Sequence, residues 1–161
     1  MMPRRSFLCR ALLGSVGLAV IPATLSLVRR PSLWITDDEP SVAFAVQLFS
    51  RHHRICNARI FASKSKAIEC LQTAVEKPAL IVTDYWSSEM RGDEFIRLAR
   101  HASPGTKIIL FSAVVGSAEE YIDCAGLNAL KPDAIVEKPN VGKLIMTLAG
   151  AMRNQAASPI L

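Results

Sequence analysis

From residue 33 onward, short apolar runs alternate with longer stretches that mix apolar and polar residues. The short runs predict five β-strands, at residues 33–36, 58–62, 79–83, 107–111 and 134–137. The runs at 80–82 and 108–110 read Leu-Ile-Val and Ile-Ile-Leu, without polar alternation. Such strands are typical of a parallel sheet that is covered by helices on both faces.

The longer stretches predict five helices, at residues 41–53, 64–76, 93–101, 117–130 and 141–153. In the first two, apolar residues recur three or four positions apart, so each helix has one stripe to bury. These residues are Val42, Ala45, Val46 and Phe49 in the first helix and Ile68, Leu71 and Val75 in the second. Pro40 is placed to open a helix, and Ser103-Pro104-Gly105 to close one.

The strict alternation of strands and helices predicts an α/β fold, namely a doubly wound (βα)5 three-layer sandwich around a parallel five-stranded sheet. In such a sheet, the direction of winding switches at one point. A crevice opens there at the carboxyl ends of the strands, and we expect the functional residues at that edge.

Composition and charge favour a single domain. Half of the 161 residues are apolar, which is enough for one core of ordinary size. The net charge of +5 comes from five arginines before residue 31, whereas the rest of the chain balances 14 basic against 14 acidic residues. We therefore expect no direct nucleic-acid binding. The predicted organisation is a leader at 1–31, a folded domain at 32–153 and a frayed tail at 154–161.

The leader contains an uncharged, mostly apolar run at residues 11–28, with arginines on both sides. Three explanations are open: a translation start placed too early, an inner-membrane tether, or an export signal, since Arg4-Arg5 resembles a twin-arginine motif. The four cysteines are Cys9, Cys56, Cys70 and Cys124. They form no C-x-x-C pair, which favours reduced thiols and a cytoplasmic location.

Ionisable or hydroxyl groups follow four of the five predicted strands. Asp37 and Asp38 follow the first strand, Asp84 the third, Ser112 the fourth and Lys138 the fifth. If the first and third strands are neighbours, the three carboxylates meet and require a cation, for which Mg²⁺ is suited. Lys138 and Ser112 would then face phosphate oxygens, and one acid would act as the nucleophile of an acyl phosphate.

Each of these residues also has a purely structural explanation. Asp37 and Asp38 can cap the following helix, Asp84 can belong to a turn, Ser112 can cap a helix and Lys138 can be a solvated charge. Their joint placement at one edge of the sheet favours the phosphoryl-acceptor hypothesis.

Five features also resemble, in order and spacing, the signatures of bacterial response-regulator receiver domains. They are the acidic pair in Ile35-Thr36-Asp37-Asp38-Glu39-Pro40, the phosphoacceptor strand in Ile81-Val82-Thr83-Asp84-Tyr85, the loop glycine Gly92, the switch hydroxyl in Ile109-Leu110-Phe111-Ser112-Ala113, and the turn Glu137-Lys138-Pro139, commonly cis in relatives. The resemblance covers about residues 32–153. It implies a CheY-like, flavodoxin-like sheet with strand order 2-1-3-4-5.

The resemblance implies a role for each site residue. Asp84 would be phosphorylated. Asp38 and Asp84 would bind Mg²⁺ directly, Asp37 through water, and the backbone carbonyl of Trp86 would add a ligand. Lys138 would neutralise the phosphoryl group, and Ser112 would move toward it on activation.

The chain also departs from the family pattern. Ser87-Ser88 stand where most relatives have Met-Pro, which removes a rigid turn and loosens the loop. Ile135 occupies the position of a switching aromatic residue. Trp86 and Val114 occupy the two positions that influence hydrolysis of the acyl phosphate in such domains, and they imply slow autodephosphorylation.

The expected function is that of a stand-alone receiver domain without an attached effector domain. It would be phosphorylated by a histidine kinase or phosphotransfer protein, would act on a downstream protein, and would meet a membrane only through the leader. The main rival is a receiver-like adaptor that does not use phosphate. An enzyme such as an aspartyl-intermediate phosphatase or a flavodoxin-like nucleotide-binding protein would need an acid two residues beyond its nucleophile or a glycine-rich loop, and the sequence has neither.

Overall fold

The computed structural model of the chain describes residues 31–52, 56–113 and 131–156. Within these residues, strands and helices alternate as expected, and each strand lies within one residue of its predicted bounds. The elements are β1 (Ser32–Thr36), α1 (Pro40–His52), β2 (Asn57–Phe61), α2 (Lys64–Thr73), β3 (Leu80–Thr83), α3 (Gly92–Ala102), β4 (Lys107–Ser112), β5 (Ala134–Glu137) and α5 (Val141–Ala156). The helix expected at 117–130 lies outside the described residues.

The five strands form one sheet in the order β2-β1-β3-β4-β5, and every neighbouring pair is parallel. The predicted fold class and strand order are therefore confirmed. The register sets Ile35 of β1 between Ile60 of β2 and Val82 of β3. The chain thus starts near the middle of the sheet, moves to the β2 edge and returns past β1 to β3.

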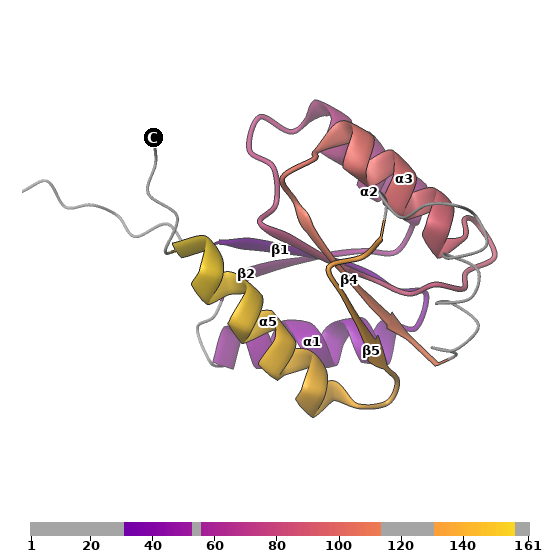
Figure 1. The fold of residues 1–161 in the computed structure, drawn as a ribbon. Coiled ribbons are helices and arrows are strands. Elements are labelled where there is room, and N and C mark those ends of the chain that lie inside the picture. Colours follow the sequence, from indigo (N-terminus) through magenta and orange to yellow (C-terminus); the bar gives the residue numbers. More distant parts are fainter. Residues whose placement is uncertain (1–30, 53–55, 114–130, 157–161) are drawn as a thin grey trace, which may run out of the picture.

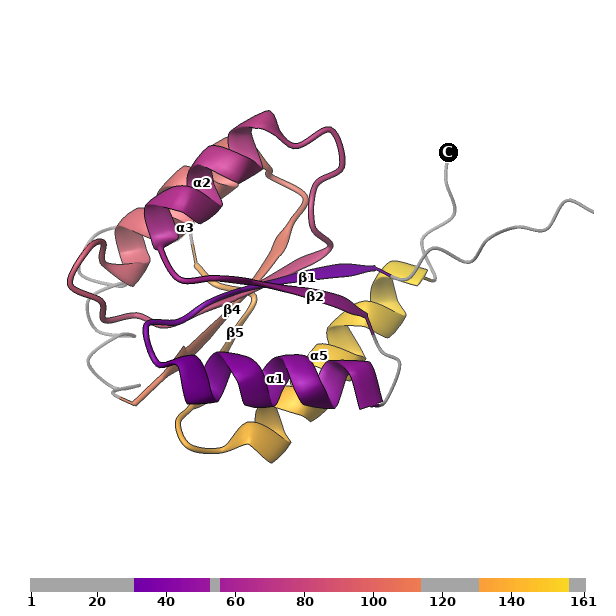
Figure 2. The ribbon, with the colours of Figure 1, turned by 180° about the vertical axis from the view of Figure 1, so that it is seen from behind.

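Helices cover both faces of the sheet. Figures 1 and 2 show α1 and α5 on one side and α2 with α3 on the other. Successive strand residues face opposite layers: Leu33 and Ile35 pack in the core with α1 and α5, whereas Trp34 packs in the core with α2 and α3. Both cores consist of buried apolar side chains, so this is a three-layer sandwich.

The second helix is shorter than its apolar stripe predicts. Ser63 caps its start by accepting a hydrogen bond from the Lys66 amide at 3.2 Å. At its end, the ammonium of Lys77 donates to the carbonyls of Leu71 and Gln72. The helix stops at Thr73, and Val75 is 99% exposed, so the predicted burial of Val75 was wrong.

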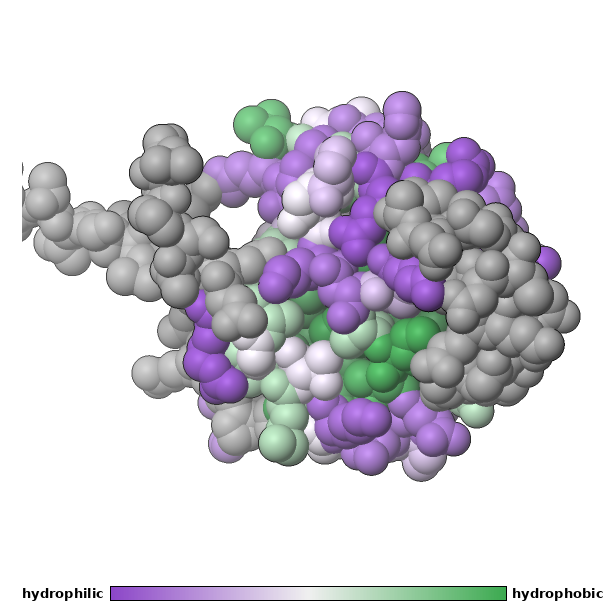
Figure 3. All heavy atoms as spheres, viewed as in Figure 1, coloured by the Kyte–Doolittle hydropathy of each residue, from purple (hydrophilic) through white to green (hydrophobic). Residues whose placement is uncertain are grey.

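Figure 3 shows mainly hydrophilic residues over α2 and α3, a surface of intermediate hydropathy over α5, and a hydrophobic group over β5. Among the described residues, no helix is both long and apolar enough to cross a membrane. The apolar run at 11–28 lies outside these residues, so the explanations offered for it stay predictions. Cys56 and Cys70 are free thiols.

We predict that Gly92→Ala destabilises the fold. A Cβ atom at Gly92 would lie 2.7 Å from Cδ2 and 2.8 Å from Cα of the fully buried Tyr85, and that backbone cannot move aside easily. Overpacking of this kind costs about 2 kcal/mol, which urea unfolding would measure. Gly150→Ala in α5 is the matched control, since its Cβ would meet nothing within 4 Å. It should leave stability unchanged or raise it, and equal losses in both variants would contradict the steric explanation.

Candidate functional site

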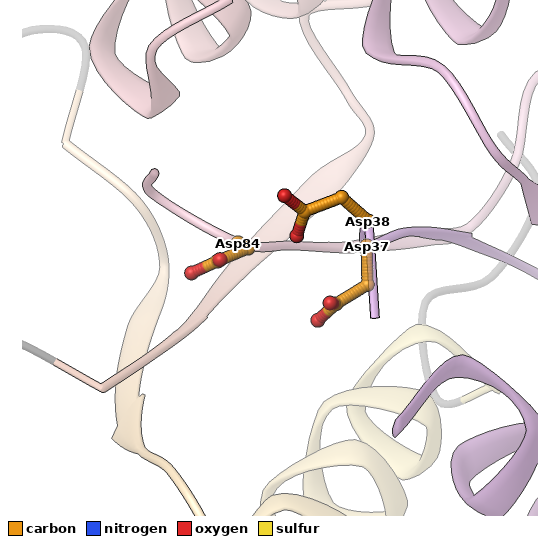
Figure 4. A group of neighbouring side chains, drawn as sticks. All are labelled: Asp37, Asp38 and Asp84. Carbon is orange, nitrogen blue, oxygen red and sulfur yellow. The ribbon is translucent and has the colours of Figure 1, made fainter. Parts of the chain in front are cut away.

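Three carboxylates meet where β1 and β3 end side by side. Asp37 and Asp38 follow β1, and Asp84 follows β3, the hydrogen-bonded neighbour of β1. The Asp84 amide donates to the Thr36 carbonyl at 3.1 Å, which fixes the two strand ends against each other. One oxygen from each of the three aspartates lies within 4.8 Å of the others, and Figure 4 shows the side chains entering one common space.

Lys138 joins this cluster from the end of β5. Its Nζ lies 3.0 Å from Oδ2 of Asp37 and 3.4 Å from Oδ2 of Asp84, so one ammonium bridges two of the acids. The Lys138 amide donates to the Ser112 carbonyl at 2.9 Å, which places the lysine beside the end of β4. The Lys138-Pro139 peptide bond is cis.

The pKa values of Asp37 and Lys138 are both raised, although burial and charge act in opposite directions on each group. Burial raises the pKa of Asp37 and Asp84 adds to the rise, while hydrogen bonds from the Glu39 amide and Lys138 oppose it. For Lys138, burial alone would lower the pKa, but the attraction of Asp37 and Asp84 outweighs it and the pKa is raised. Lys138 is therefore a permanent cation at neutral pH.

The donor set fits a hard divalent cation. It offers carboxylate oxygens from three residues, and oxygen is the ligand that Mg²⁺ prefers. Among the described residues, the buried Oδ2 of Asp37 has no hydrogen-bond donor despite its ion pair with Lys138, and Asp38 is exposed. Oxygen atoms that are crowded and only partly compensated suit a metal better than they suit a purely structural cap.

The remaining predicted residues lie around the cluster. Ser112 ends β4 and is fully buried, and its Oγ has no hydrogen-bond partner among the described residues. Ile135 is half-buried and packs against Tyr85 and Leu110. Trp86 is 41% exposed, with its ring edge-on to Tyr85. Val114 lies outside the described residues.

Comparison with known proteins identifies the fold of the chain. No protein-family model matches the sequence, and no curated protein is significantly similar to it. Solved structures do match. The receiver domain of a Francisella response regulator is 17% identical, with 78% of this chain and 98% of that chain covered and a TM-score of 0.65. The chain has the fold of a response-regulator receiver domain.

Two other receiver domains match in the same way. A CheY-like one from Methanospirillum hungatei JF-1 is 20% identical, with 78% of this chain and 96% of that chain covered and a TM-score of 0.67. The receiver domain of an HD domain-containing protein from Pseudomonas fluorescens Pf-5 is 17% identical, with 81% and 100% covered and a TM-score of 0.67. At these identities the matches establish the receiver fold, and the roles of individual residues remain predictions.

The receiver fold also assembles residues that the sequence did not single out. A cleft beside the aspartates is lined by Thr36, Asp37, Asp38, Phe61, Ala62, Ser63, Lys64, Ser87, Ser88 and Glu89. Lys64 in this cleft is almost completely buried. Glu89 accepts hydrogen bonds from Ser63 Oγ at 2.8 Å and from the Lys64 amide at 3.1 Å, so it caps α2 from the β3–α3 loop. The sequence pattern did not predict a role for Lys64 or Glu89, because their contacts join residues about 25 positions apart.

We predict that Glu89→Gln weakens the receiver fold in a pH-dependent way. Hydrogen bonds from Ser65 and Ser63 lower the pKa of the exposed Glu89, so its contribution to stability is complete above the ordinary glutamate pKa. That contribution is lost as the pH falls through the lowered value in the folded state. Because the group is exposed, we expect a loss of only a few tenths of a kcal/mol at neutral pH.

Urea unfolding of both proteins at a series of pH values would measure this difference. Glu69→Gln, at an exposed glutamate of α2, controls for the loss of one negative charge. A stability difference that stays constant down to strongly acidic pH would rule out the capping role of Glu89.

Proposed function

We propose that this protein is a phosphoacceptor receiver domain: Asp84 takes a phosphoryl group from a histidine kinase or phosphotransfer protein, and the chain signals by contact with another protein. The observation that carries the proposal is the position of Asp84, within one cluster with Asp37 and Asp38 and 3.4 Å from the ammonium of Lys138. A carboxylate that lies beside an ammonium group, with two further acids that can hold a divalent cation, is arranged to receive an anionic group.

The transfer is a displacement at phosphorus. A carboxylate oxygen of Asp84 bonds to phosphorus while the P–N bond of a phosphohistidine donor breaks. The electron pair of that bond stays on the imidazole nitrogen, which takes up a proton from solvent. Oδ1 of Asp84 accepts a hydrogen bond from the Tyr85 amide at 2.7 Å, and this contact orients the carboxylate.

The chain's own residues would share the remaining work. Asp38, Asp84 and the Trp86 carbonyl would hold Mg²⁺ directly and Asp37 through water, and the bound ion would neutralise charge on the phosphoryl oxygens. Lys138 would pair with one phosphoryl oxygen. The buried Ser112 hydroxyl would find in the phosphoryl group the partner that it lacks among the described residues.

The signal would leave through a protein surface. We propose a downstream protein partner, a cytoplasmic location and no direct contact with nucleic acid, because the basic residues in excess all precede residue 31. Ile135 stands where a switching aromatic is usual, so activation would rest mainly on the movement of Ser112.

The first test is chemical phosphorylation of the full chain. Incubation with acetyl phosphate and Mg²⁺ should add one phosphate, detected by intact-mass measurement, and Asp84→Asn should abolish the adduct. Asp93→Asn is the matched control, since Asp93 lies in α3 and pairs with Arg91 outside the cluster. An adduct that persists in Asp84→Asn would contradict Asp84 as the acceptor, and no adduct with any donor would favour the phosphate-independent adaptor.

We further predict a long-lived acyl phosphate. Val114 has no polar side-chain group and Trp86 has only an indole N–H donor, so neither orients an attacking water well and the label should persist for minutes or longer. Trp86→Asn and Val114→Glu should each hydrolyse it about tenfold faster, in line with a positioned polar group. Loss of the label within seconds from the unaltered chain, with no effect of either substitution, would contradict this prediction.

A further inference from the structure

Lys64 places a buried amine next to the acidic cluster. It is the first residue of α2 and is only 3% exposed. Its Nζ donates to the carbonyls of Tyr85 at 3.2 Å and Met90 at 3.0 Å, both in the loop that follows Asp84. A buried ammonium is unfavourable unless its charge is compensated, so its surroundings must supply that compensation.

The two carbonyls do not depend on Lys64. The Gly92 amide also donates to the Tyr85 carbonyl at 2.7 Å, and Ser87 Oγ donates to the Met90 carbonyl at 2.8 Å. The loop is therefore closed by its own contacts. Removal of the amine would leave neither carbonyl without a donor.

The compensating charge comes from the aspartates. Among the described residues, no carboxylate lies within ion-pair distance of Lys64, yet Asp37 and Asp38 line the same cleft and Asp84 precedes the Tyr85 carbonyl that it contacts. Burial lowers the pKa of Lys64, while Asp84, Asp38, Asp37 and Glu89 act against this, in that order. The three aspartates thus favour the charged form of the amine and offset part of the effect of burial.

We propose that Lys64 is a second, built-in cation of the phosphoacceptor site, an inference that rests on the function proposed above. Its charge offsets part of the negative charge of the three aspartates. It therefore weakens the binding of Mg²⁺ and strengthens the binding of an anionic phosphoryl group at Asp84. Lys138 forms ion pairs with individual carboxylates. Lys64, held by carbonyls of the loop after Asp84, interacts with all three aspartates through its charge.

This role differs from that of a simple loop contact in the sign of its effects. If Lys64 only held the loop in place, its loss would loosen both the cation and the anion site. A charge acts with opposite signs on the two ligands. Because Mg²⁺ carries twice the charge of a trifluoroberyllate anion, the effect on Mg²⁺ should be the larger one.

The experiment measures both ligands on the full chain. Mg²⁺ is titrated against tryptophan fluorescence in a Trp34→Phe background, so that the signal comes from Trp86, two residues after Asp84. The trifluoroberyllate anion, a phosphoryl analogue, is titrated at saturating Mg²⁺ and followed by fluorine NMR. The neutral variants are Lys64→Met, which keeps the apolar stem, and Lys64→Gln. Lys64→Arg retains the charge, and Lys66→Gln removes an exposed charge from the same helix. Thermal unfolding selects the neutral variant that is folded.

We expect the neutral variant to bind Mg²⁺ about tenfold more tightly and trifluoroberyllate about threefold more weakly, as one unit of nearby charge predicts. Lys64→Arg should restore both affinities to near those of the unaltered chain, and Lys66→Gln should change neither.

Weaker binding of both ligands, or no change in either, would overturn the inference while the proposed function stands. If the unaltered chain binds Mg²⁺ but no trifluoroberyllate, the phosphoacceptor function itself fails, and the role of Lys64 falls with it.

Discussion

The hydrogen-bonded pairing of β1 with β3 is the constraint on which the site depends. It places the strand ends that carry Asp37 and Asp84 next to each other and joins them through the Asp84 amide and the Thr36 carbonyl. Carboxylates brought so close repel one another, and the site is stable only because cations share their space. Lys138 contributes its charge by direct ion pairs at 3.0 and 3.4 Å.

Different contacts stabilise the opposite end of the sheet, where β4 and β5 begin. Arg100 donates to the Thr106 carbonyl at 2.7 Å and to the Asp133 carboxylate at 2.6 Å, and the same carboxylate accepts the Ile108 amide at 2.8 Å. These bonds join α3, β4 and the segment before β5. Polar contacts therefore stabilise the end of the sheet that lies away from the aspartates, whereas at the aspartate end Lys138 compensates part of the negative charge.

Side-chain contacts hold the loop after Asp84 in place, although Ser87-Ser88 stand where the resemblance to receiver domains leads one to expect a rigid Met-Pro turn. Ser87 bonds to both the amide and the carbonyl of Met90, Glu89 caps α2, and Gly92 allows the chain to pass directly against Tyr85. That Ser87-Ser88 loosens the loop stays a prediction. Side-chain contacts across the cleft provide an alternative restraint.

The sequence by itself determined the order of strands and helices, the burial of β3 and β4, and the presence of an acid, a hydroxyl or an amine at the strand ends. These features are local, since periodicity and turn residues act over a few positions. Their prediction was accurate at the strands and less so at the helix ends: α2 ends at Thr73, Lys77 donates to the Leu71 and Gln72 carbonyls near this end, and Val75 lies beyond it, exposed.

The local pattern left open which strand ends are neighbours, and the resemblance to receiver domains supplied the strand order that the structure confirms. Only the tertiary structure showed that Lys138 bridges Asp37 and Asp84, and that Lys64 and Glu89 join the cleft. Lys64 illustrates the reason. A lysine that opens a helix looks like a solvated charge, and it becomes a buried cation because a loop 21 to 26 residues away folds over it. Burial of a charge depends on such distant contacts, and no local pattern records them.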